Sequence, residues 1–188
     1  MRFTNKDLKN MIIPLFLEQL LVMQVGIADT LVSGGVVIVS QCMGADDTDQ
    51  AEYYFKKLMK ITVAASVAWN VIIFAATPLM LMAYDLSAET KGLVIWLVVI
   101  HNVFNALAYP FSGALSAGLR GAGDVKFTMI VTVISTIGIR LLLSVLFGIV
   151  LDMRVIGIAF AMCADWLFKA ALFENRFSRG KWKQFKVI

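Results

Sequence analysis

The sequence has few of the features that build a water-soluble enzyme. Only 16% of its 188 residues are charged, and it has one histidine, two cysteines and three prolines. Cys42 and Cys163 lack the spacing of metal ligands, so neither a disulfide framework nor a zinc site is expected. We also find no nucleophile–base set, and we therefore expect neither an enzyme nor a bound cofactor.

Apolar residues dominate the composition instead. They make up 60% of the chain, whereas about 45–50% is usual for soluble domains. A water-soluble fold of this length could not bury so much apolar surface, so we expect the lipid bilayer to be its solvent. The net charge of +4 does not indicate a nucleic-acid partner, because no basic-aromatic surface or finger motif accompanies it.

Five apolar blocks predict an all-α fold, a polytopic bundle with about five membrane segments. A helix needs about 20 residues to cross the hydrocarbon, and lipid offers no partner for free backbone groups. The blocks cover residues 11–43, 61–84, 92–118, 127–151 and 155–173. We divide the chain into an N-terminal membrane segment with a Gly-Gly break (1–43), a cytoplasmic interfacial linker (44–60), a four-helix transmembrane bundle (61–175) and a basic cytoplasmic tail (176–188).

Polar residues between the blocks predict helix starts. In the linker, Asp47 or Thr48 is a candidate N-cap, and Ser87 is another before the third block. Basic residues gather in the tail, in 44–60 and in 119–126, whereas 85–91 has only Lys91. Because basic residues mark the cytoplasmic side, we expect a multi-pass protein of the plasma membrane, the bacterial inner membrane, with both termini cytoplasmic.

Residues 11–43 do not fit this pattern easily. Cytoplasmic flanks on both sides require an even number of crossings, but two complete helices need about 40 residues. Two interpretations stay open. The segment is either one long tilted helix broken near Gly34-Gly35, or a re-entrant hairpin that turns there, because glycine makes a turn sterically easy.

Several motifs resemble those of multidrug and toxic compound extrusion (MATE) transporters. Gly26-Ile-Ala-Asp-Thr30 is similar to the family's first helix. The most specific match, Leu119-Arg-Gly-Ala-Gly-Asp-Val-Lys-Phe-Thr128, resembles the "LRGAGD" motif of its C-terminal half. The resemblance implies membrane transport, namely efflux of organic or drug-like compounds by antiport coupled to H⁺ or Na⁺. Cationic or amphipathic small molecules are the implied substrates.

The resemblance also has a large gap. The family has two bundles of six helices, whereas this chain joins the first helix to the last four or five, at a seam within residues 31–43. We therefore expect a partial transporter that needs a second copy of itself, as a homo-oligomer, or a missing half. The alternatives are an inactive membrane fragment and a protein related to flippases for lipid-linked substrates.

Two acids in the first block are candidates for ion coupling. Asp29 leads, because an ionisable group inside a bilayer is costly and marks function by default, and the resemblance implies proton or sodium coupling there. Glu18 lies eleven residues earlier, which returns it nearly to the same helix face, about 16 Å away along the axis. The alternatives are a wetted helix end for Asp29 and an interfacial position for Glu18.

Two further charges fall near mid-depth on consecutive antiparallel helices. We expect Arg140 and Asp165 to form a buried ion pair, because pairing relieves the cost of burying either charge. Lys169 lies one turn beyond Asp165 and competes for it. A role in gating or substrate binding is the alternative. His101 is expected to be a packing residue.

Overall fold

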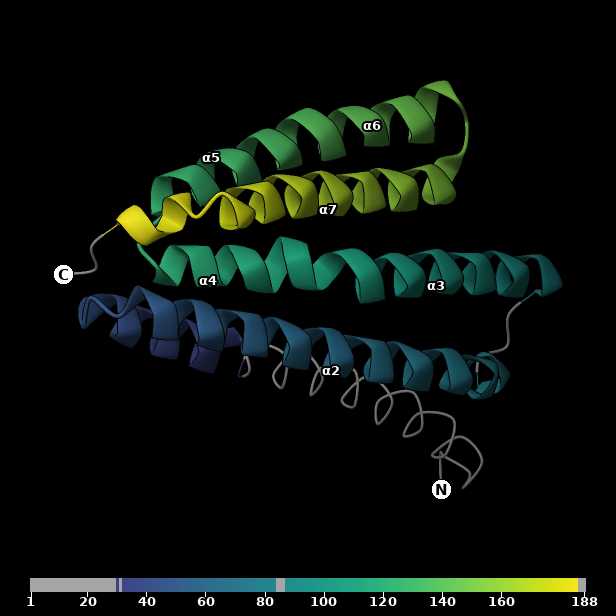
Figure 1. Cartoon of the computed structure of the whole chain (residues 1–188). Helices are drawn as coiled ribbons and strands as arrows, with labels where there is room; N and C mark the ends of the chain where they lie inside the picture. The colour runs from purple at the N-terminus through teal and green to yellow at the C-terminus, as the bar shows by residue number, and fades with distance from the viewer. Residues whose placement is uncertain (1–29, 31, 84–86, 186–188) are drawn as a thin grey trace, which may run out of the picture.

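The computed structural model describes residues 30, 32–83 and 87–185, and the regular secondary structure in this part of the chain is entirely helical. A helix over Val32–Gly44 is followed by the labelled elements of Figure 1. The prediction of an all-α fold is confirmed. The elements are α2 (Thr48–Ala83), α3 (Ala88–Tyr109), η1 (Pro110–Ala114), α4 (Leu115–Gly121), α5 (Val125–Ile134), η2 (Ser135–Leu141), α6 (Leu142–Val145), η3 (Leu146–Val150), α7 (Arg154–Ser178) and η4 (Lys181–Gln184).

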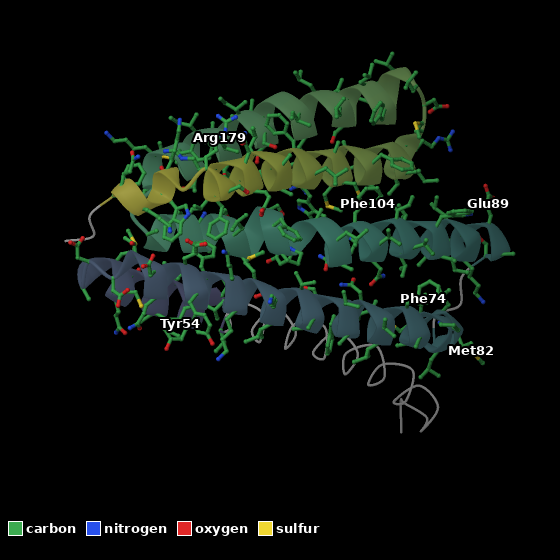
Figure 2. All side chains as sticks on the ribbon, viewed as in Figure 1. Tyr54, Phe74, Met82, Glu89, Phe104 and Arg179 are labelled. Carbon is green, nitrogen blue, oxygen red and sulfur yellow. The ribbon has the colours of Figure 1, made fainter. Side chains whose placement is uncertain are left out.

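Four stretches of the described chain are long and apolar enough to cross a membrane. They are Thr48–Met82, Ala88–Gly121, Val125–Val150 and Arg154–Ser178. Their outer faces carry large apolar side chains, including Phe74 and Met82 of α2 (Figure 2), which are 55% and 82% exposed. Because water would not favour such a surface, these faces are suited to lipid, and the chain is a multi-pass membrane protein.

The helices lie side by side, with α7 in a central position. The span from α5 to η3 packs along one side of α7, and α3 lies on the other side of α7. Helix α2 packs against α3 (Figure 1). Three π-helical segments, η1, η2 and η3, all contact α7. Polar side chains on α7 can therefore reach partners on both flanking helices.

The starts of α2 and α3 confirm two expected helix caps. The Asp47 carboxylate accepts a hydrogen bond from the Gln50 backbone N–H at 3.0 Å, and Ser87 similarly caps α3 through the Thr90 N–H at 3.3 Å. Both capping predictions are confirmed. Residues 48–60 of the predicted linker belong to α2, which continues without interruption from Thr48 to Ala83, so the linker leads directly into the first bundle helix.

The glycine pair does not break the helix in which it lies. Residues 32–44 are helical through Gly34 and Gly35, so neither the break nor the turn expected at these glycines is present in the described residues. Gly35 serves close packing instead, because a Cβ there would lie 2.7 Å from Cδ1 of Leu58. Residues 11–29 and 31 of the segment lie outside the described residues.

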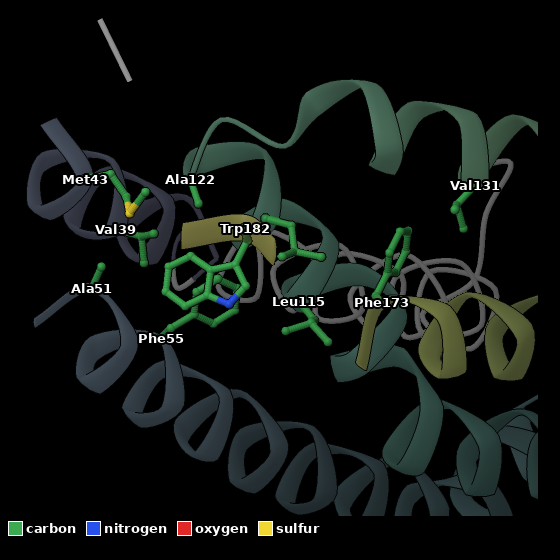
Figure 3. Close-up of a cluster of buried hydrophobic side chains, with 10 residues drawn as sticks. Val39, Met43, Ala51, Phe55, Leu115, Ala122, Val131, Phe173 and Trp182 are labelled. Carbon is green, nitrogen blue, oxygen red and sulfur yellow. The ribbon is translucent and has the colours of Figure 1, made fainter. Parts of the chain in front are cut away.

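A buried cluster joins the ends of five helical elements. Val39, Phe55, Leu115, Phe173 and Trp182 are each at most 2% exposed (Figure 3). The Trp182 indole stacks on Phe177 with ring centroids 5.5 Å apart and donates a hydrogen bond to the Phe177 carbonyl. The tail is thus anchored in the bundle, since α7 continues to Ser178 and η4 carries Trp182. We call this end of the bundle the tail end.

The "LRGAGD" motif forms a tight turn at the tail end. Gly123 has a φ of 94°, which favours glycine, and it directs the chain from α4 into α5. Asp124, whose side chain is 2% exposed, accepts hydrogen bonds from Arg176 Nε at 2.7 Å and Nη2 at 3.2 Å. The guanidinium also lies 4.6 Å from the centroid of the Phe127 ring. The motif's acid therefore ties the start of α5 to the end of α7.

Breaking this ion pair is expected to destabilise the bundle. Asp124→Asn leaves the Arg176 guanidinium without its counter-charge, and such a loss costs about 3–5 kcal/mol. We expect the midpoint of thermal unfolding in detergent, followed by size-exclusion chromatography, to fall by roughly 6–20 °C. Asp152→Asn is the control, because Asp152 has a side chain that is 79% exposed. Equal midpoints for the two variants would contradict this assignment.

Close packing between α7 and η3 gives a second stability prediction. A Cβ on Gly157 would lie 2.6 Å from the Phe147 carbonyl carbon and 2.9 Å from the Gly148 nitrogen, both backbone atoms. Gly157→Ala should therefore separate the two helices at a cost of about 1–3 kcal/mol and lower the same midpoint. Gly138→Ala is the control, because its nearest neighbour would be 4.0 Å away. If both substitutions left the midpoint unchanged, the tight packing would be disproved.

Candidate functional site

A polar cluster lies between η2 and α7, near the middle of the membrane-spanning stretches Val125–Val150 and Arg154–Ser178. Asp165 is fully buried, and one of its oxygens accepts a hydrogen bond from the Ser135 hydroxyl. Its other oxygen accepts one from Lys169 Nζ at 2.9 Å. Lys169 also donates to Thr136 Oγ1 at 3.2 Å. We call Ser135, Thr136, Asp165 and Lys169 the mid-bundle cluster.

The local sequence explains how these groups meet. Lys169 follows Asp165 by one helical turn, so the two side chains lie on the same face of α7. Ser135 and Thr136 open η2, a π-helical segment of a type that occurs frequently at functional sites. Both hydroxyls thereby reach α7, and each one contacts a different charged partner. The cluster links two spans through hydrogen bonds as well as through charge.

The electrostatics of the cluster are balanced. A lone carboxylate in an apolar interior is very costly, and the Asp165 side chain has no exposure to solvent. The Lys169 ammonium compensates its charge, with a side chain that is itself 12% exposed. The ion pair therefore lies within α7, and the hydrogen bonds of its two members to Ser135 and Thr136 hold α7 against η2.

The structure does not join Arg140 to Asp165, which corrects the expected ion pair. Both Asp165 oxygens already have partners, because Oδ1 accepts from Ser135 and Oδ2 accepts from Lys169, which lies on the same helix. Arg140 is exposed on η2, and no ion pair connects it to any residue that the structure describes. The competing lysine is thus the partner of Asp165.

Other polar groups lie between the spans but do not join the mid-bundle cluster. Asn70 Nδ2 of α2 donates to Asn105 Oδ1 of α3 at 3.0 Å. His101 of α3 lies edge-on to Trp166 of α7, with ring centroids 5.3 Å apart, which is consistent with a packing role. Within the described residues, no three His, Cys, Asp or Glu side chains come together to hold a metal ion.

The cavities lie elsewhere. An open groove of about 760 Å³ runs between the helix Val32–Gly44 and the α4–α5 turn, lined by Val36, Ser40 and Arg120 among others. This volume is within the range of small-molecule sites, but the groove includes no candidate predicted from the sequence. Glu18 and Asp29 lie outside the described residues, so their coupling roles stay predictions.

Sequence reasoning missed two hydroxyls and one arginine. Ser135 and Thr136 are polar residues within an apolar block, at the depth of Asp165, and this signal could have identified them. Arg176 gave no comparable signal, because it lies 52 residues from Asp124 and looks like one of many basic tail residues. Its pairing with Asp124 depends on the packing of α7 beside the α4–α5 turn, which only the tertiary structure shows.

Removing one partner from the mid-bundle cluster tests whether it is structural. Lys169→Met leaves the buried Asp165 carboxylate without its counter-charge, and we expect a loss of about 3–5 kcal/mol, seen as a lower midpoint of thermal unfolding in detergent. The double variant Asp165→Asn/Lys169→Met should regain part of that loss. Arg140→Met is the matched control and should not destabilise the protein, since Arg140 has no ion pair in the described region. A larger loss for Arg140→Met than for Lys169→Met would refute this pairing.

Comparison with known proteins gives one family match. A sequence model of the MatE family matches residues 16–146, more than half of the chain. The match includes Glu18, Asp29 and Arg140 and ends before α7. No solved structure matches the chain.

Proposed function

The chain belongs to the MatE family of membrane transporters, and we propose that it works as part of an antiporter that exports organic compounds in exchange for H⁺ or Na⁺. The match to residues 16–146 carries this proposal. The four stretches able to cross a membrane support it. The proposed substrates are cationic or amphipathic small molecules, and the lipid bilayer is the proposed medium.

Asp29 is the proposed coupling residue, and Glu18, eleven residues earlier, is the second candidate. A carboxylate in an apolar cavity holds its proton more tightly, and a nearby cation weakens that hold. Binding of a cationic substrate or Na⁺ can therefore release the proton, and protonation can release the cation. Such competition for one acid is sufficient to couple export to an ion gradient.

Alternating access requires more than four spans. Transporters of this kind commonly move one helical repeat against another around a site near the middle of the bilayer. We therefore propose that the chain assembles with a second copy or with a separate half-transporter. The substrate path would then run between the two bundles.

The distribution of basic residues supports an orientation. The tail end carries most of the charged side chains outside the apolar stretches, whereas the opposite end of the described bundle has few. We propose that the tail end faces the cytoplasm of a bacterial cell, because basic residues are retained on that side of the inner membrane. The basic residues at the tail end include Lys56, Lys57, Arg120, Lys126, Arg179, Lys181 and Lys183, and those at the opposite end are Lys91 and Arg154.

Flux through proteoliposomes tests the antiport. Wild-type protein should accumulate or release rhodamine 6G, a cationic dye, when a pH or Na⁺ gradient is imposed. Asp29→Asn should lower the gradient-driven rate by at least about tenfold, because the amide cannot bind a proton or exchange it. Glu18→Gln should have a smaller effect, and Asp152→Asn is the matched control for loss of one acid.

Two results would count against the proposal, and they differ in meaning. No gradient-driven flux by the wild type, alone or mixed with a candidate partner chain, would identify an inactive membrane fragment. Flux that Asp29→Asn leaves intact would keep transport but remove Asp29 from the coupling mechanism.

A further inference from the structure

Arg140 is a cation in the middle of a membrane-spanning stretch. It lies about 4 Å from the midpoint of Val125–Val150, counted along the helix axis. Val150, at the nearer end, is ten residues away, which corresponds to about 15 Å. Charged residues at such depth face a bundle interior or a water-filled cavity and mark substrate or ion paths. Arg140 therefore needs a partner of opposite charge.

The described acids do not supply this partner. Both oxygens of Asp165 are bonded to Ser135 and Lys169. The remaining acids of the described residues lie toward the ends of the spans and not at the depth of Arg140. They are Asp46, Asp47, Asp49, Glu52, Glu89, Asp124, Asp152 and Glu174.

The surroundings of Arg140 add further hydrogen-bond donors. Thr136 precedes it by four residues on η2, and the Thr136 hydroxyl accepts a hydrogen bond from Lys169 Nζ at 3.2 Å. An ammonium has three donors, of which Lys169 uses two, for Thr136 and Asp165. Lys169 is compensated by Asp165, whereas Arg140 has no ion pair among the described residues and keeps an uncompensated positive charge.

We propose that Arg140 binds the anionic group of an amphipathic substrate, such as a carboxylate, sulfonate or phosphate. A guanidinium matches the geometry of these groups with two parallel hydrogen bonds. Ile137 and Leu141, which are 60% and 57% exposed on the same stretch, offer apolar surface to the rest of such a molecule. This inference rests on the proposed transport function and favours substrates with an acidic group over purely cationic ones.

A matched pair of dyes tests the anionic group. Rhodamine B carries a free carboxylate, and its ethyl ester has the same ring system without that charge. Binding of each dye is measured by fluorescence anisotropy, with the full chain in phosphatidylcholine nanodiscs and with empty nanodiscs as background. The wild type should bind rhodamine B about tenfold more tightly than the ester, in line with one charge-assisted hydrogen-bonded contact.

Variants then assign the preference to Arg140. Arg140→Gln should abolish the preference while changing binding of the ester less than about twofold, and Arg140→Lys should retain part of it. Lys126→Gln is the matched control, because it removes one positive charge from the first turn of α5 and should keep the preference.

Adding phosphatidylglycerol distinguishes the source of the anion. Competition by this lipid would indicate that the site also takes lipid phosphate.

Three results would overturn the proposal. They are equal binding of both dyes by the wild type, a preference that survives Arg140→Gln, and a preference lost equally in Lys126→Gln. If the wild type showed no preference but the Asp29→Asn or Glu18→Gln variant did, Arg140 would be shown to pair with an acid of this chain. Binding is measured without a gradient, so a preference without flux would refute the transport function and leave the anion site standing.

Discussion

The bilayer offers no counter-charge, so each charged group within the spans depends on partners that the chain or its ligands supply. Asp165 meets this requirement with Lys169 from its own helix and Ser135 from η2. The arrangement places α7 at the centre, because α7 carries the acid and also contacts the three π-helical segments. The mid-bundle cluster therefore sets the position of α7 relative to η2, and the outer helices pack around that pair.

The tail end is stabilised differently from the middle of the bundle, because it combines ion pairs with a cluster of buried aromatic rings. Asp124 and Arg176 join the α4–α5 turn to the end of α7, and Lys183 of η4 pairs with Glu52 of α2. The rings of Phe55, Phe177 and Trp182 form a mutual cluster, with centroids 4.7 Å apart for the two phenylalanines and 5.6 Å and 5.5 Å apart for the pairs with Trp182. This end is tied together by several segments that are distant in the sequence, which suits it to act as a rigid base for motions of the spans.

The chain belongs to the MatE family, and Arg140 has no ion pair among the described residues; together these observations support separate roles for two charged groups. An acid near the start of the chain would exchange cations, while a basic face on η2 would hold an anionic group of the substrate. Separating the two charges on different helices would let a zwitterionic or acidic amphiphile bind without competing directly for the coupling acid. A second bundle would be needed to enclose the substrate between these faces.

The sequence by itself determined the spans and their starts, because hydropathy and capping are local: four apolar blocks became four long helices, and Asp47 and Ser87 capped as expected. Tertiary structure decided which charges met. Asp165 forms its ion pair with Lys169 rather than with Arg140, and Asp124 forms one with Arg176. The side chain of Trp182, in the tail, is buried. The helix is also continuous through Gly34-Gly35, and the absence of a Cβ at Gly35 leaves room for the Leu58 side chain. These outcomes depend on distances between helices, which no local pattern contains.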